Sequence, residues 1–96
     1  MPGNKKYEIS YLSSVVKQDI PALSEEWSWR IKKTIEDKLF YNPEIFGKPL
    51  RGSLKNFRSL RVGDYRVIYL IEKKTVLVVV IEHRSVVYKH ILKRIS

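Results

Sequence analysis

The sequence contains no cysteine and only one methionine among its 96 residues. Without cysteine, disulfide bonds and thiolate metal sites are excluded, and the fold needs no oxidising compartment. The longest apolar run, Val76–Ile81, is far shorter than the roughly 20 residues of a membrane-spanning helix. The N-terminal residues lack the apolar stretch of a signal peptide. We therefore expect a cytoplasmic protein with no membrane partner.

Acidic residues are also scarce relative to basic ones. Ten Asp and Glu face 19 Lys and Arg, which gives a formal net charge of +9. Such an excess favours a nucleic acid, an acidic protein partner or an anionic membrane surface, with a merely solvated positive face as the plain alternative. The proportions of 44% hydrophobic and 30% charged residues are those of a globular protein, and the length predicts one domain spanning residues 1–96.

The N-terminal region is predicted to form a strand and a short helix. Residues 7–12 alternate in polarity, which is the period of a strand with one buried face. Ser13 or Ser14 can cap a short helix after this strand. That helix should end near Ile20, because Pro21 lacks an N–H and clashes with the preceding turn.

A longer helix is predicted from its N-cap, Ser24, to a point before Pro43. Two glutamates follow the cap, where the helix dipole favours negative charge. An apolar stripe recurs every four residues and comprises Trp27, Ile31, Ile35 and Leu39. Its place on this stripe favours core packing for Trp27 over base stacking, whereas Trp29 lies off the stripe and could do either.

The region after this helix is predicted to begin with a loop and continue as three strands. Asn42–Ser53 carries two prolines and two glycines, and we expect Phe46 and Leu50 to pin this loop to the core. The strands are expected at Phe57–Val62, Tyr65–Glu72 and Thr75–Glu82, with turns at Gly63-Asp64 and Lys73-Lys74. The last of them is apolar on both faces, as in a strand covered on both sides.

The final segment, Ser85–Ile95, has helical apolar spacing with basic residues between, which predicts a short basic amphipathic helix. The complete order is strand, helix, helix, strand, strand, strand, helix. This order predicts an α+β fold in which two N-terminal helices form one layer on a small, mainly antiparallel sheet. The open face of that sheet would carry the arginines.

Three motifs occur in order along the chain: Pro49-Leu50-Arg51-Gly52, the run from Leu60 to Tyr69, and His83-Arg84 followed by Val87-Tyr88. Together they resemble the RelE/ParE superfamily of bacterial and archaeal toxins, and specifically the RelE-type messenger-RNA interferases. The resemblance implies a microbial RNase-like sheet and the toxin of a type II toxin–antitoxin system. It also implies binding to the ribosome, cleavage of translated messenger RNA, and neutralisation by a cognate antitoxin in a hetero-oligomer. The toxin alone is expected to be a monomer.

RNA cleavage by the 2′-hydroxyl needs a base, positive donors for the phosphorane-like charge, and an acid for the leaving 5′-oxygen. The resemblance places Arg66, Arg84 and Tyr88 at the site, and His83 is the other candidate for proton transfer. Further RNA- or phosphate-binding candidates are Arg61, Arg58, Arg51 and Lys55. Three of the candidates have a structural alternative. For Arg66 this is a salt bridge to Glu72 or Asp64, for Tyr88 a place in the core, and for His83 an ordinary hydrogen-bonding role at the end of a strand.

The sequence leaves other functions open. Two histidines without suitably spaced carboxylates predict no metal site, and no cofactor is expected. RelE-type enzymes often carry lysines on the strand where this chain has Phe57, Arg58 and Ser59. The alternatives are therefore a ParE-like inhibitor of DNA gyrase without nuclease activity, or an inactive homologue that binds RNA or an antitoxin.

Overall fold

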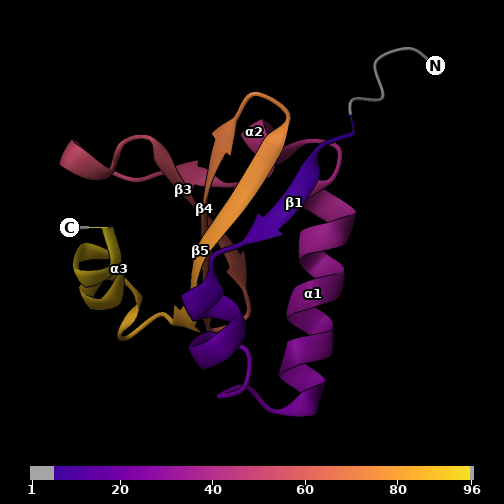
Figure 1. Cartoon of the computed structure of the whole chain (residues 1–96), viewed down its shortest axis with the longest axis vertical. Coiled ribbons are helices and arrows are strands. Elements are labelled where there is room, and N and C mark those ends of the chain that lie inside the picture. Colours follow the sequence, from indigo (N-terminus) through magenta and orange to yellow (C-terminus); the bar gives the residue numbers. More distant parts are fainter. Residues whose placement is uncertain (1–5, 96) are drawn as a thin grey trace.

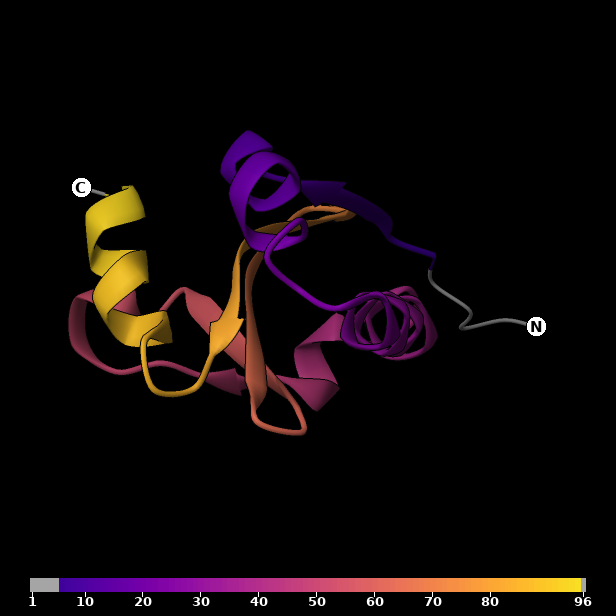
Figure 2. The same ribbon diagram turned by 90° about the horizontal axis from the view of Figure 1, so that it is seen from below.

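The computed structural model describes residues 6–95 of the chain, which form a mixed five-stranded sheet with helices on both faces (Figures 1 and 2). The strand order is β1-β5-β4-β3-β2. The strands are β1 (Glu8–Tyr11), β2 (Lys48–Pro49), β3 (Phe57–Val62), β4 (Tyr65–Glu72) and β5 (Thr75–His83). The helical elements are η1 (Val15–Asp19), α1 (Glu25–Leu39), α2 (Pro43–Phe46), η2 (Gly52–Leu54) and α3 (Val87–Ile95). The predicted α+β class is confirmed.

The antiparallel meander follows the sequence pattern closely. β3 and β4 have the predicted bounds, and β5 continues one residue further than predicted. The two turns fall where they are predicted, with positive φ angles of 59° at Gly63 and 55° at Lys73. β1 pairs with β5 in parallel and the other pairings are antiparallel, so the sheet is mainly antiparallel.

α1 has the predicted N-terminus and buried stripe. Ser24 has extended backbone angles, and its hydroxyl accepts the Trp27 amide proton at 3.2 Å. Ile31, Ile35 and Leu39 are buried against the face of the sheet that carries Leu60, Val67, Tyr69 and Val78. The short predicted helix is a π-helical turn, η1, in which the Ile20 amide donates to the Val15 carbonyl at 2.9 Å. Among the described residues, no helix is long and apolar enough to span a membrane.

The segment predicted as a loop contains three short elements, namely α2, β2 and η2. Pro43 occupies the first turn of α2, which suits a residue without an N–H, and β2 pairs with β3 at the edge of the sheet. Leu50 packs against the second core, as expected. The expectation for Phe46 is wrong, since its side chain is 43% exposed. The next residue, Gly47, is buried instead, and its backbone lies so close to the Tyr69 ring that an added Cβ would overlap it. The loop therefore meets the core at Gly47.

The expectation of one helical layer and an open second face is also wrong. Figure 2 shows α1 and α3 on opposite faces of the sheet. α3 buries Val87 and Ile91 in a second core together with Ile68, Val79 and Val80. The cause is the apolar character of β5 on both faces, which needs a cover on each side. The basic residues of that second face are therefore confined to the part that α3 leaves uncovered.

Candidate active site

A groove of about 710 Å³ lies on the α3 side of the sheet. Its walls come from the end of α2, the segment from β2 to η2, the strands β3 and β4, and the first turn of α3. The residues that line it are Phe46, Lys48, Pro49, Leu50, Arg51, Leu54, Ser59, Arg61, Arg66 and Tyr88. Three candidate arginines and the candidate tyrosine thus meet in one cavity, although they span nearly forty positions of the sequence.

The charges along this groove are of one sign. Within the described part of the chain, its lining carries four cations, Lys48, Arg51, Arg61 and Arg66, and no carboxylate. Like charges gathered along low-dielectric walls raise the local positive potential and attract anions. Guanidinium groups add forked donors that match phosphate oxygens. The groove is therefore suited to a phosphorylated ligand.

Arg61 and Arg66 stand directly opposite each other on β3 and β4. Their Nε and Nη1 atoms donate to one acceptor, the carbonyl of Gly63 in the connecting turn, at 3.4 and 3.2 Å. Arg66 Nη1 also donates to the Tyr65 carbonyl at 3.0 Å, in place of the salt bridge considered from the sequence. Like charges at opposed positions of a hairpin destabilise it. An anion bound between the two guanidinium groups would relieve that repulsion.

Tyr88 enters the groove from the first turn of α3, and its side chain is 47% exposed. It is not the core tyrosine that the sequence left possible. Buried Val87 beside it and Ile91 one turn later fix the helix on the sheet. The phenol places a hydroxyl group in the same cavity as the two opposed guanidinium groups.

The other candidates for proton transfer and phosphate contact lie outside the groove lining. Arg84 packs on the turn, where its amide donates to the Asp64 carbonyl at 2.8 Å and its Nε lies 3.9 Å from the Asp64 carboxylate. His83 faces the α1 side, edge-on to Tyr65 at 5.8 Å between centroids. Its Nδ1 accepts the Ser85 amide proton at 3.1 Å. The structure thus places Arg84 on Asp64, in the same turn whose Gly63 carbonyl accepts from Arg61 and Arg66, and it separates His83 from Tyr88.

Arg58 and Lys55 are also separated from the groove. Arg58 pairs with Tyr69 in the β3–β4 register, on the α1 side of the sheet, and its Nη1 donates to the Gly47 carbonyl at 2.7 Å. Lys55 follows η2 and is exposed outside the lining. Arg58 therefore braces the backbone behind Phe46.

Six of the ten lining residues are not among the predicted site residues, namely Phe46, Lys48, Pro49, Leu50, Leu54 and Ser59. Phe46 and Lys48 are the aromatic residue and the cation among these six. Both belong to the segment read as a loop, and Phe46 was assigned to the core. The available signal was Lys48, a further cation immediately before the Pro49-Leu50-Arg51-Gly52 motif.

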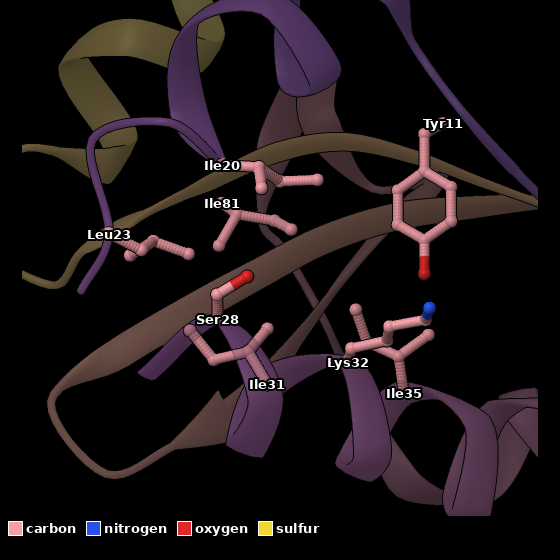
Figure 3. Close-up of a pocket in the computed structure, with 8 residues that line it drawn as sticks. All are labelled: Tyr11, Ile20, Leu23, Ser28, Ile31, Lys32, Ile35 and Ile81. Carbon is pink, nitrogen blue, oxygen red and sulfur yellow. The ribbon is translucent and has the colours of Figure 1, made fainter. Parts of the chain in front are cut away.

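A second cavity, of about 320 Å³, lies between α1, the chain after η1 and β5 (Figure 3). Its walls are mostly apolar, and Figure 3 shows the Lys32 ammonium and the Tyr11 hydroxyl pointing toward each other at one end. Burial, and then the charge of Glu36, raise the pKa of Tyr11, so this phenol remains protonated. The described residues contain no cluster of three or more His, Asp or Glu that could hold a metal ion. The cation-lined groove remains the stronger candidate for chemistry.

Comparison with known proteins places this geometry among relatives. A family model described as the ParE toxin of the type II toxin–antitoxin system, parDE, matches residues 13–88. The Toxin RelE of Mycobacterium tuberculosis is 31% identical over 91 residues, which is 93% of both chains. The toxin–antitoxin complex RelBE2 of M. tuberculosis is similar with a TM-score of 0.76 and 27% identity, over 83% of this chain and 93% of that one. The archaeal RelE–RelB complex of Pyrococcus horikoshii has a TM-score of 0.64 and 28% identity, over 82% and 96%.

Proposed function

The chain belongs to the RelE/ParE superfamily of type II toxin–antitoxin toxins, and from this premise we propose that it is a ribosome-dependent endoribonuclease that cleaves translated messenger RNA. The observation that carries the proposal is the groove, in which Arg61, Arg66 and Tyr88 meet without a carboxylate among the described lining residues. A toxin that only binds a protein target would not require two opposed arginines, Arg61 and Arg66, in the same groove as the Tyr88 hydroxyl. A phosphodiester supplies both the charge and the leaving oxygen that such a set can serve.

In the proposed reaction, the 2′-oxygen of one nucleotide attacks the adjacent phosphorus and the bond from phosphorus to the 5′-oxygen breaks. Arg61 and Arg66 hold the phosphate and stabilise the extra negative charge of the transition state. Tyr88 donates its proton to the departing 5′-oxygen. The products are a 2′,3′-cyclic phosphate and a 5′-hydroxyl. No metal ion takes part in this scheme.

The proton of the 2′-hydroxyl needs a separate acceptor. Arginine cannot take it, because the guanidinium stays protonated, and His83 lies on the other side of the sheet. We assign this proton to a group of the ribosome, and this assignment accounts for the need for the ribosome. Arg51 in the groove and Arg84 at the turn are assigned to the flanking phosphates.

A cognate antitoxin is the second proposed partner. The solved relatives of M. tuberculosis and P. horikoshii are complexes of this kind. A net charge of +9 favours an acidic antitoxin, and covering the groove would silence the toxin. We propose a monomeric free toxin and a hetero-oligomer with the antitoxin in the cytoplasm, where translated messenger is found.

Primer extension on a messenger after brief induction tests the nuclease. The wild type should give cuts within translated codons, and Arg66→Ala and Tyr88→Phe should remove them. Arg30→Ala is a matched control, because Arg30 is exposed on α1 and stacks on Trp27 at 4.4 Å, away from the groove. Intact messenger in cells that express folded wild-type protein would overturn the proposal.

The ParE family match gives a second candidate, inhibition of DNA gyrase. A supercoiling assay with purified protein and gyrase separates the two functions. Inhibition of supercoiling without cuts in translated messenger would favour the gyrase target. Arg61, Arg66 and Tyr88 would then be residues of a binding surface.

A further inference from the structure

Phe46 is an exposed aromatic side chain in the groove that four cations line. It ends α2, 43% of it is exposed, and it lines the groove together with the four cations. Exposure alone is not unusual, because single apolar side chains often lie on protein surfaces. What distinguishes Phe46 is that its ring is exposed in a cavity lined by four cations. The proposed roles of Arg61, Arg66 and Tyr88 at the phosphate do not require the Phe46 ring.

The backbone around Phe46 is held rigidly, although its ring is outside the core. On one side the Pro43 carbonyl accepts the Tyr69 hydroxyl proton, and on the other the Gly47 carbonyl accepts from Arg58 Nη1 at 2.7 Å. Both donors lie on the α1 side of the sheet, where α2 packs against α1, and Tyr69 is fully buried. The ring therefore projects from a fixed support, which lowers the entropy lost when a ligand contacts it.

The surroundings of the ring favour a nucleobase as that ligand. The Lys38 ammonium lies 5.4 Å from the ring centroid, so the platform is cationic as well as aromatic. Aromatic side chains within a positively charged groove are the usual means of holding single-stranded nucleic acid, with bases on the rings and phosphates on the cations. A volume of about 710 Å³ exceeds what a lone phosphate group needs and falls in the usual range for ligand-sized sites.

We propose that Phe46 stacks a base of the RNA substrate next to the cleaved phosphate, so that the groove holds the messenger as an unpaired strand. This rests on the proposed nuclease function and adds a positioning residue to it. Arg61 and Arg66 fix the phosphate, and Phe46 fixes the neighbouring base. Together they set the angle at which the 2′-oxygen faces the phosphorus.

A double-mutant cycle between protein and RNA tests the proposal. Ribosomes carry a message in the A site, either intact or with one abasic nucleotide beside the cut, and single-turnover cleavage is measured. Phe46→Leu, which keeps an apolar side chain but removes the stacking surface, should slow cleavage of intact message about tenfold. Loss of the base should slow the wild type similarly, and it should slow Phe46→Leu little further. Phe46→Tyr should cleave at close to the wild-type rate.

The control is Ile45→Ala, because Ile45 is 69% exposed on the same helix and does not line the groove. It should cleave as the wild type does. If the wild type cleaves and Phe46→Leu cleaves equally well on intact message, the stacking inference is wrong while the nuclease stands. If Phe46→Leu weakens only antitoxin binding, the ring is a protein contact and the inference also fails. Absence of wild-type cleavage would instead overturn the nuclease itself.

Discussion

Arg94 on α3 and Asp19 at the end of η1 form a bidentate ion pair, with Nη1 and Nη2 each 2.7 Å from a carboxylate oxygen. The Asp19 side chain is only 1% exposed. Its Oδ2 also accepts the Ile81 amide proton at 2.8 Å, and Arg94 Nη1 donates to the Val79 carbonyl at 2.9 Å. The pair therefore ties α3, and Tyr88 with it, to η1 and to β5.

Removal of the Asp19 charge should lower the free energy of unfolding. Asp19→Asn leaves the Arg94 guanidinium without its counter-charge, and loss of one partner of a buried pair costs about 3–5 kcal/mol. Urea denaturation measures the change. Asp37→Asn is the matched control, because the Lys33–Asp37 pair is exposed and 3.8 Å long, and such pairs contribute about 0–1 kcal/mol. Equal stability losses in the two variants would contradict the structural role of Asp19.

The opposed arginines predict that activity and stability can be separated. Arg61→Gln removes the cross-strand repulsion with Arg66, so the free energy of unfolding should be unchanged or rise by a few tenths of a kcal/mol. Cleavage should fall by about 100-fold, as on loss of one donor to a transition-state anion. Thermal melting and single-turnover cleavage give the two readings. Arg61→Lys keeps the charge and should keep the wild-type stability. Destabilisation of Arg61→Gln by more than about 1 kcal/mol would contradict the repulsion argument.

Alkaline pH should destabilise the fold through Tyr69. Burial raises the pKa of Tyr69 to about 12, whereas an unfolded tyrosine has a pKa of about 10. Because the folded state holds the proton more tightly, the stabilisation is complete below pH 10 and is lost as the pH rises toward 12. Urea midpoints between pH 8 and pH 11 should fall accordingly. Tyr69→Phe should flatten the profile without abolishing it, since the pKa of Tyr7, bonded to Glu44, and that of Tyr11 are raised too. An unchanged slope in Tyr69→Phe would exclude Tyr69 as a cause.

The close approach of Gly47 to Tyr69 predicts a coupled pair. In Gly47→Ala the new methyl group would overlap the Tyr69 hydroxyl most and the adjoining ring carbons less, and such overpacking costs about 1–3 kcal/mol. Tyr69→Phe removes the worst overlap and releases the ring from its hydrogen bond to the Pro43 carbonyl, so the ring can shift. The double variant should therefore lose less stability than the sum of the two single variants. Denaturation of all three variants completes the cycle. Additive losses would show that the backbone moves away from the ring instead.

The sequence predicted the elements whose periodicity and boundary residues agree. β3 and β4 are bounded by a glycine turn and by alternation, and α1 by Ser24 and its apolar stripe. The short elements between Asn42 and Ser53 were not predicted, because an element of two to four residues is too short to show a hydrophobic period. α2 and β2 are defined by tertiary contacts, above all those of Gly47 with Tyr69 and Arg58.

Only part of the site was predicted, because its composition also depends on tertiary contacts. Arg61 and Arg66 were identified, but which cations share a face depends on strand parity. Arg58 precedes Arg61 by three positions, so alternation places the two on opposite faces of β3, and this could have been read from the sequence. The two apolar faces of β5 indicate that the second face needs a cover, but the helix pattern of Ser85–Ile95 does not show that this helix supplies it. The position of His83 depends likewise on the β-bulge between β4 and β5.

The parallel pairing of β1 with β5 bears on how the toxin is made. Glu8 pairs with Thr75, so β1 has no partner until the meander has been synthesised, and such distant pairings form slowly. The groove is completed even later in synthesis, because Tyr88, which lines it, belongs to α3, and α3 follows β5 in the sequence. A nascent chain emerges N-terminus first. While β5 and α3 are still inside the ribosome, the nascent chain has no assembled groove. A nuclease of the kind we propose would therefore be unable to cut its own message before its synthesis is complete.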